Sequence, residues 1–460
     1  MKKIYLLIAG LLLALALLIT GSVLLDKQLE KDSSFISDRV DFDKTAYSHT
    51  ADSASGINVN SAFPLMEMEV TENEKTLKDL SDVASDHEII FTDLGELEVD
   101  AMLTEEEWGL RIQNGINASN INEYNRLCSN LFYYNQLDSK TKQTYLEIYI
   151  SLLNFTDSFY ICTIDPEEID YAFNCVMGDH PEIFYVNGYM FTKYTIEGVI
   201  IKVEFTPGYT MTEDEAGEYF AHIKAYKDAF LKGISRSATD YEKVKYTYEF
   251  VILNTEYDLN SEENQNILSV FMYGKSVCQG YSKAFQYLLS QLDVQSALVV
   301  GYVSNNEGHA WNIVRCNGQY YYIDCTWGDS SYMNNASAAS GLGINYDYLN
   351  ITTEELEKTH IIDNFADIPE CNSIRDNYYV REGYYFSRVD ESQISEVFNK
   401  AVNEGRPSVE IKCSDAKTYD KMGVYLLDEN HIFDYMPASM DTLTYVKNTE
   451  MYIYSFPLNN

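Results

Sequence analysis

The chain has 460 residues, of which 46% are hydrophobic and 14% aromatic, so it can bury the cores of two or three domains. Its 33 basic and 71 acidic residues give a formal net charge of −38. Nucleic acids and anionic lipids attract basic proteins, so this charge excludes nucleic acid as a partner and excludes binding along an anionic membrane surface. It is compatible with cationic partners, although solubility alone accounts for it.

An apolar run opens the chain. Residues 4–25 follow Met1-Lys2-Lys3 and are interrupted only by small or weakly polar side chains. A run of this length can cross a bilayer, and the lysines place its start on the cytoplasmic side. Residues 1–25 are therefore predicted to be a signal peptide or an uncleaved membrane anchor. The rest of the protein would then be secreted or held at the extracellular face of the membrane, with no other membrane contact.

Two regions of different character follow. Residues 26–115 are rich in Asp, Glu, Ser and Asn without a sustained hydrophobic period, which predicts an acidic, partly disordered stalk. Residues 116–236 predict an N-terminal α+β domain. Helical periodicity covers residues 122–135 and 139–153, and strand-like runs extend to Phe205.

Polar motifs mark element boundaries in this N-terminal domain. Asp165-Pro166 is a typical helix start, with the aspartate as cap and the proline in the first turn. Thr212 begins a capping-box spacing before a further helix. His180 and Glu182 are separated by a proline, which indicates a turn rather than a second catalytic site. We interpret the domain as the wall of a substrate cleft or as an adaptor.

A cysteine stands at the start of a later helical pattern. The apolar side chains after it are spaced three and four residues apart, as on one face of a helix; they are Tyr281, Ala284, Phe285, Leu288, Leu289 and Leu292. Cys278 is therefore predicted to lie at a helix N-terminus, where unpaired N–H groups favour thiolate over thiol. Gly280 allows another part of the backbone to approach closely. Because a thiolate is a strong nucleophile, Cys278 is a candidate catalytic residue.

The turn between His309 and Asp324 determines how these two residues lie relative to each other. Asn317-Gly318 separates two runs rich in β-branched and aromatic residues and predicts a hairpin with a two-residue loop. In that register His309 and Asp324 become diagonal neighbours on one face, within reach of an imidazole–carboxylate hydrogen bond. A three-residue loop would send Asp324 to the opposite face.

Three motifs occur here in a specific order. They are Val277-Cys278-Gln279-Gly280-Tyr281, His309-Ala310-Trp311-Asn312 and Tyr322-Ile323-Asp324-Cys325-Thr326-Trp327, preceded by a helix-like run over 244–260. Over about 240–360 the chain resembles the transglutaminase-like superfamily, a papain-related group that includes many bacterial surface proteins. The resemblance implies that Cys278 is the nucleophile, His309 the general base and acid, and Asp324 the carboxylate that orients the histidine.

One residue departs from the family pattern. Eukaryotic transglutaminases usually carry a tryptophan directly after the cysteine, where this chain has Gln279. The departure weakens the expectation of amine transfer more than that of thiol chemistry.

The resemblance implies an α+β fold. Residues 237–371 are expected to form a papain- or transglutaminase-like catalytic domain, with the nucleophile helix packed on an antiparallel sheet. Residues 372–460 predict a small C-terminal α+β domain whose tyrosines form a core or, alternatively, a polymer-binding face. The polar stretch 330–343 is expected to be a surface loop, with a lid as the alternative.

The expected reaction is extracellular, thiol-dependent acyl transfer at an amide bond, with hydrolysis of a protein or peptide substrate, including substrates at the cell surface. Protein cross-linking by amine transfer and a catalytically silent binding module stay open as alternatives. The backbone N–H of Cys278 is one expected oxyanion donor, and Tyr257 or Gln265 is a candidate for a second. No cofactor is expected.

The chain contains eight cysteines. None of their spacings forms the CxxC pair typical of zinc knuckles. In the predicted hairpin, Cys316 and Cys325 lie too far apart for a disulfide. Neither a structural metal site nor an obligatory disulfide framework is therefore predicted.

Overall fold

The computed structural model describes residues 73–74, 90–92, 94–97, 99–196, 198–303, 306–329, 344–437 and 444–458. The chain separates into residues 1–55 and 56–460, and everything described belongs to the second unit. The predicted leader at 1–25 and the polar stretch 330–343 lie outside the described residues. Within the described ranges, no helix is both long enough and apolar enough to cross a membrane.

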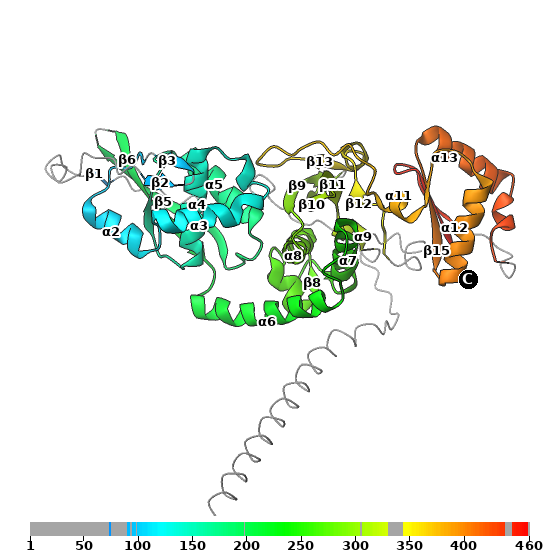
Figure 1. The fold of residues 1–460 in the computed structure, drawn as a ribbon, viewed down its shortest axis with the longest axis horizontal. Helices are drawn as coiled ribbons and strands as arrows, with labels where there is room; N and C mark the ends of the chain where they lie inside the picture. Colours follow the sequence, from blue (N-terminus) through cyan, green and yellow to red (C-terminus); the bar gives the residue numbers. More distant parts are fainter. Residues whose placement is uncertain are drawn as a thin grey trace, which may run out of the picture. The chain divides into compact units, whose positions relative to one another are not determined.

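The N-terminal folded region combines a sheet with a group of helices (Figure 1). The sheet has the order β1-β5-β6-β4, and β5 and β6 form a long antiparallel hairpin. Its strands are β1 (Asn73–Glu74), β4 (Phe159–Ile161), β5 (Val186–Ile196) and β6 (Val199–Tyr209). The helices are α2 (Glu105–Gln113), α3 (Ala118–Leu127), α4 (Ser139–Leu153), α5 (Pro166–Asp179) and α6 (Glu213–Lys232), and a short hairpin pairs β2 (Ile90–Thr92) with β3 (Gly95–Leu97). Asp165 and Thr212 cap α5 and α6 as predicted.

Residues 99–115 are part of this folded region, although their composition had suggested the stalk. Their buried apolar side chains include Val99, Ala101 and Leu103. Helix α2 begins after Thr104 with a capping box, and Arg111 on its buried face pairs with the Glu147 carboxylate at 2.6 Å. The acidic first turn that indicated a solvated stalk stabilises a helix N-terminus instead. The boundary therefore lies earlier than residue 115.

The predicted helix at 122–135 is wrong in its second half. Helix α3 ends at Leu127, and short 3₁₀ turns follow. The Asp179 carboxylate at the end of α5 accepts hydrogen bonds from the backbone N–H groups of Tyr133 and Tyr134, at 3.0 and 2.8 Å. These bonds fix residues 133–134 in the short turns that follow α3.

The central region is built on an antiparallel sheet of order β12-β11-β10-β9-β13. Its strands are β9 (Ser296–Val303), β10 (Gly308–Cys316), β11 (Gln319–Ile323), β12 (Leu349–Ile351) and β13 (His360–Ile362). The hairpin of β10 and β11 has the predicted register, from Cys316–Gln319 to Asn312–Ile323. Both turn residues have positive φ, 49° at Asn317 and 81° at Gly318, as a two-residue type I′ turn requires.

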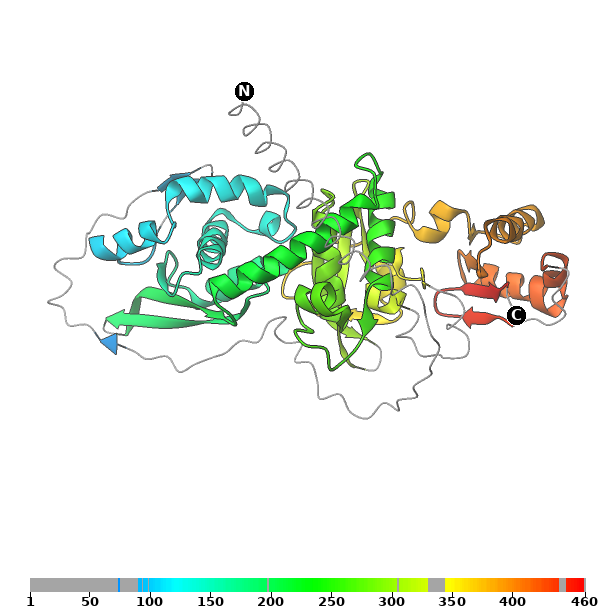
Figure 2. The same cartoon turned by 90° about the horizontal axis from the view of Figure 1, so that it is seen from below.

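Two helices cover this sheet (Figure 2). Helix α7 (Asp240–Leu253) starts at Thr239 with a capping box and contacts α8 (Cys278–Ser290), which in turn contacts β9 and β10. The apolar face predicted for α8 is buried, and the Trp311 side chain of β10 is fully enclosed. The expected α+β fold, with a helix packed on an antiparallel sheet, is confirmed.

The C-terminal region has its own sheet, of order β14-β15-β17-β16. Its elements are α11 (Tyr378–Glu382), β14 (Tyr385–Phe386), α12 (Glu391–Glu404), β15 (Ser408–Cys413), α13 (Ala416–Gly423), β16 (Val446–Asn448) and β17 (Ile453–Pro457). Its buried tyrosines include Tyr378, Tyr379, Tyr384 and Tyr454. Core packing therefore accounts for them. All eight cysteines lie in the described ranges, where they are free and buried.

Gly301 tests how tightly the central sheet is packed. A Cβ atom there would lie 2.0 Å from the Ile361 carbonyl oxygen of β13 and 2.8 Å from the Trp311 ring. Since backbone cannot yield cheaply, we expect Gly301→Ala to destabilise the protein by about 1–3 kcal/mol or more. Gly217→Ala is the matched control, because nothing lies within 4 Å of a Cβ on this helical glycine. It should stabilise by up to about 1 kcal/mol. Urea unfolding measures both, and equal midpoints would contradict the packing.

Candidate active site

Cys278 is the first residue of α8, which confirms its predicted position at a helix N-terminus. Its N-cap residue, Val277, gives the helix no side-chain hydrogen bond. The terminal N–H groups therefore present their partial positive charge at this end, where it stabilises a thiolate. The thiol lies in a small cluster of buried residues with Leu298, Val300 and Ala310.

The segment before the helix is held against it at Gly280. A Cβ atom on Gly280 would lie 1.9 Å from the Ser276 hydroxyl and 2.6 Å from the Ser269 hydroxyl. These two hydroxyls also bond each other at 2.6 Å. The absence of a side chain thus lets the chain pass close to α8 just before the cysteine, as the sequence predicted.

The two candidate side-chain oxyanion donors differ in how they are placed beside this segment. Tyr257 belongs to β7 (Glu256–Tyr257), which pairs in parallel with β8 (Lys275–Ser276), so Tyr257 lies level with Ser276. Gln265 is exposed and donates its amide N–H to Asn264 Oδ1 at 3.1 Å. The geometry favours Tyr257.

His309 on β10 and Asp324 after β11 meet as predicted. His309 Nε2 and Asp324 Oδ2 are 2.8 Å apart, and both side chains are buried. The ladder between the strands ends at Asn312–Ile323, so Asp324 lies just beyond it. Because Nε2 is engaged with the carboxylate, Nδ1 is the ring nitrogen left for the Cys278 thiol, whose interaction with this imidazole raises the pKa of His309.

The second oxygen of Asp324 organises the backbone after the strand. Asp324 is the N-cap of the one-turn helix α9 (Cys325–Gly328). Its Oδ1 accepts hydrogen bonds from the N–H groups of Thr326 and Trp327, at 2.9 and 3.1 Å. The carboxylate is therefore held in place from both of its oxygens.

A second histidine, which sequence reasoning missed, reaches the same carboxylate. His360 Nε2 lies 3.2 Å from Asp324 Oδ2, and His360 Nδ1 lies 2.8 Å from the Thr359 hydroxyl. The side chain is fully buried. It arrives through β13, which pairs with β9 after the one-turn helix α10 (Thr353–Leu356). The pairing of β13 with β9 leaves no local signal in the sequence.

The charges of this cluster follow from its contacts. Burial opposes the charged form of His309, but the neighbouring Asp324 carboxylate and the Cys278 sulfur outweigh it and raise the pKa of His309 to about 10. Burial also acts against the charged form of Asp324, yet His309 and His360 hold the pKa of this carboxyl well below its usual range. Burial lowers the pKa of His360 despite its bond to Asp324. At neutral pH, His309 is an imidazolium, Asp324 an anion and His360 neutral.

Aromatic rings enclose the polar cluster. The His309 ring lies 6.0 Å from the Trp311 ring and 6.1 Å from the Trp327 ring, between centroids. His360 lies 4.7 Å from Trp327 and 5.6 Å from Tyr348. These rings keep water from the histidine–carboxylate contacts, which strengthens the electrostatic interactions.

The same three side chains are the group in the described ranges whose ligand atoms are close enough for a metal ion. One atom each from His309, Asp324 and His360 lie within 4.8 Å of one another. Both histidines are already hydrogen-bonded to the carboxylate, so a metal would have to displace these protons and separate the side chains. The arrangement fits a hydrogen-bond network better than a metal site.

Comparison with known proteins places this region in a family. Residues 228–325 match the model of the Transglutaminase-like superfamily. The match includes Cys278, His309 and Asp324. Kyphoscoliosis peptidase from Homo sapiens is 25% identical over 111 residues, and the Mus musculus protein is 24% identical over 111 residues. Each alignment covers 21% of this chain and 17% of the relative, so the chain spans only a small part of their length.

Two solved structures are similar to part of the chain. A TGase structure is 18% identical, with a TM-score of 0.21, over 31% of this chain and 44% of that one. A candidate cysteine protease from Cytophaga hutchinsonii is 12% identical, also with a TM-score of 0.21, over 30% and 61%. The family match, the α8–sheet arrangement and the order of the three motifs identify residues 228–325 as a transglutaminase-like domain.

Proposed function

We propose that the protein catalyses thiol-dependent acyl transfer at amide bonds, with hydrolysis of a protein or peptide as its reaction. The observation that carries this proposal is the His309 imidazole, held at 2.8 Å by Asp324 through Nε2 while its other nitrogen faces Cys278. Cys278 is the nucleophile, His309 the general base and acid, and Asp324 the orienting carboxylate.

The reaction follows from these positions. The Cys278 thiolate attacks the amide carbonyl carbon, and the oxyanion that forms accepts a hydrogen bond from the Cys278 backbone N–H. His309 gives its Nδ1 proton to the leaving amine as the C–N bond breaks, which leaves a thioester on the sulfur. His309 then removes a proton from water, whose oxygen attacks the thioester and releases the acid.

Water is favoured over an amine as the second reactant. The matching relatives are named as peptidases, and Gln279 stands where eukaryotic transglutaminases usually have tryptophan. A lysine-type amine attacking the same thioester would give a cross-link instead, with identical roles for the three side chains.

Alkylation tests the activated thiol. An ordinary cysteine is less than about 1% thiolate at pH 6, whereas a helix N-terminus and a neighbouring imidazolium both favour the thiolate form. We expect iodoacetamide at pH 6 to modify Cys278 selectively, and His309→Ala to slow this modification at least tenfold. Peptide mass spectrometry measures the site and the rate.

The control for this experiment is His431→Ala, which removes a partly exposed histidine of the C-terminal region. It should leave the alkylation rate within a factor of two. A wild-type rate no higher than that of glutathione would contradict an activated thiol and favour a silent binding module.

Product analysis separates hydrolysis from transfer. A glutaminyl peptide is incubated with the protein, with and without dansylcadaverine. We expect a new amino terminus or ammonia without incorporation of the amine, and no product from Cys278→Ala. Fluorescent product would show that cross-linking is the reaction. A wild-type protein as inactive as Cys278→Ala on varied peptides would count against catalysis.

His360 is expected to act as a positioning residue. It donates to the Asp324 oxygen that also holds His309. His360→Leu removes this donor, so kcat/KM should fall about 10–100-fold, as for other residues behind a catalytic group. His360→Gln keeps an N–H donor and should recover part of the loss, which a purely structural role would not require. Equal losses in both variants, at equal stability, would contradict the assignment.

A further inference from the structure

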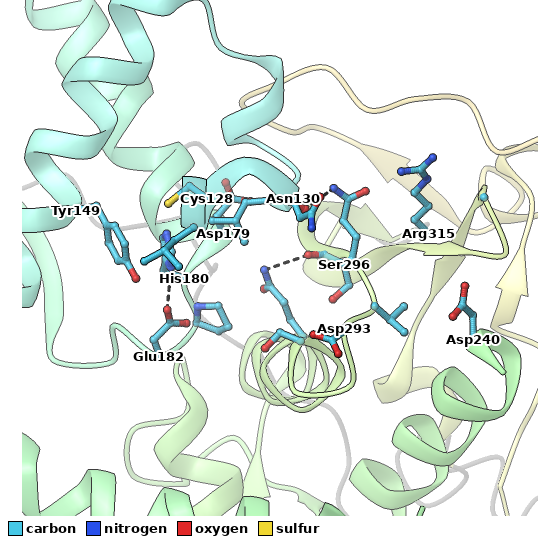
Figure 3. Close-up of a pocket in the computed structure, with 18 residues that line it drawn as sticks. Cys128, Asn130, Tyr149, Asp179, His180, Glu182, Asp240, Asp293, Ser296 and Arg315 are labelled. Atoms are coloured by element: carbon cyan, nitrogen blue, oxygen red, sulfur yellow. Dashed lines mark hydrogen bonds and ion pairs between the residues drawn. The ribbon is translucent and has the colours of Figure 1, made fainter. Parts of the chain in front are cut away.

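A cavity of about 640 Å³ lies between the N-terminal region and the central sheet (Figure 3). One wall comes from the turn after α3, from α4 and from the end of α5, with Cys128, Tyr149 and residues 179–182. The facing wall comes from α8 and the start of β9, with Gln286, Asp293 and Ser296. All of these residues belong to the unit 56–460.

The cavity is separate from the candidate active site, but α8 links the two. Cys278 begins this helix, whereas Gln286 and Ser290 line the cavity from its second half. At about 1.5 Å per residue, these positions lie roughly 12–18 Å along the helix from the cysteine. An extended peptide crosses that distance with about four to six residues.

Hydrogen bonds between the two regions hold the cavity open. Gln286 Nε2 donates to the Gly178 carbonyl oxygen at 2.8 Å, and Gln295 Nε2 donates to the Asn130 carbonyl oxygen at 2.6 Å. The Tyr133 hydroxyl also donates to the Leu298 carbonyl oxygen. The protein's own contacts therefore fix the two walls relative to each other, as is usual for a binding pocket.

Carboxylates and a buried histidine line the walls of the cavity. His180 Nδ1 bonds Glu182 Oε1 at 2.8 Å, and its ring stacks on Tyr149 at 3.8 Å. Because an ionised carboxylate only accepts, His180 donates through Nδ1, and Nε2 is the ring nitrogen left for another partner. The residue is 5% exposed, and this nitrogen has no partner in the described part of the chain. The Ser296 hydroxyl oxygen likewise has no hydrogen-bond partner among the described residues.

The charge of the cavity is negative. Asp179 is buried and already accepts hydrogen bonds from Tyr133, Tyr134 and Tyr145. It therefore adds negative electrostatic potential to the cavity rather than a direct contact to a ligand. Glu182, Asp293 and Asp240 follow one another along the cavity (Figure 3). The cationic side chain among the described lining residues is the exposed Arg315.

We propose that this cavity binds a basic peptide segment of the substrate, at a distance from the bond that Cys278 attacks. The carboxylates call for a cation with several N–H donors, and the Ser296 hydroxyl and His180 ring nitrogen, which have no partner in the described part of the chain, offer it further polar contacts. The succession of carboxylates along the cavity matches an extended chain with lysine or arginine side chains rather than a single small amine. The inference rests on the proposed function, because it names the substrate class: proteins or peptides with basic residues about four to six positions from the reacting bond.

Binding is measured apart from catalysis. The full-length Cys278→Ala protein is titrated into fluorescein-labelled octalysine at about 0.15 M salt, with octaglutamate as the reversed-charge probe, and anisotropy is recorded. We expect saturable binding of octalysine alone. Glu182→Gln with Asp293→Asn should weaken it at least fivefold. The amide oxygen that replaces the Glu182 carboxylate could still accept the His180 hydrogen bond, so the wall keeps its shape while the charge is lost.

The matched control is Glu396→Gln with Glu404→Gln, which removes the same charge from exposed positions on α12. It should change affinity less than twofold. Equal weakening by both pairs would overturn the site, since general attraction to an acidic protein would then explain binding. Displacement by n-butylamine at the same molar concentration as octalysine would overturn the peptide assignment.

Hydrogen exchange gives a second measurement that needs no variant. Octalysine should slow exchange in 179–182 and 286–296 of the wild-type protein. If octalysine slows exchange only in segments outside 179–182 and 286–296, the proposal is overturned. If octalysine binds with these effects but Cys278 shows no thiol reactivity, the proposed reaction is contradicted and the proposed peptide-binding site still stands.

Discussion

The carboxylate of Asp324 is the contact on which the rest of the central region depends. A buried anion is costly unless its oxygens are satisfied, and here the donors are the rings of His309 and His360 and the N–H groups of Thr326 and Trp327. These donors come from β10, β13 and α9. The anion is therefore stable only when distant segments have assembled, and their assembly is what aligns the imidazole with the sulfur.

Local signals were enough to predict the core of this arrangement. The Asn317-Gly318 turn sets the register of β10 against β11 because both residues tolerate positive φ, and the apolar spacing after Cys278 sets the start of α8. Both features depend only on residues that are close together in the sequence, so they can be predicted from a single sequence.

What the sequence did not reveal depends on contacts between distant segments. His360 reaches Asp324 only because β13 adds to the edge of β9, and Gly301 in β9 leaves room for β13 to approach. The helix expected through residue 135 ends at Leu127, and beyond it Asp179, more than forty residues later in the chain, takes the N–H groups of Tyr133 and Tyr134. Arg111 likewise shows that an acidic segment can carry a buried ion pair. Composition and periodicity contain no trace of such partners.

The geometry around Asp324 also limits which side chain its position can hold. Asparagine would turn an N–H₂ group toward either the histidine rings or the α9 backbone, where donors already point. Glutamate adds a methylene inside a closed aromatic shell, and alanine leaves every donor without an acceptor. Packing and reaction therefore restrict this position together, and a substitution of Asp324 is expected to loosen the attachment of β10, β13 and α9 as well as to misplace the imidazole.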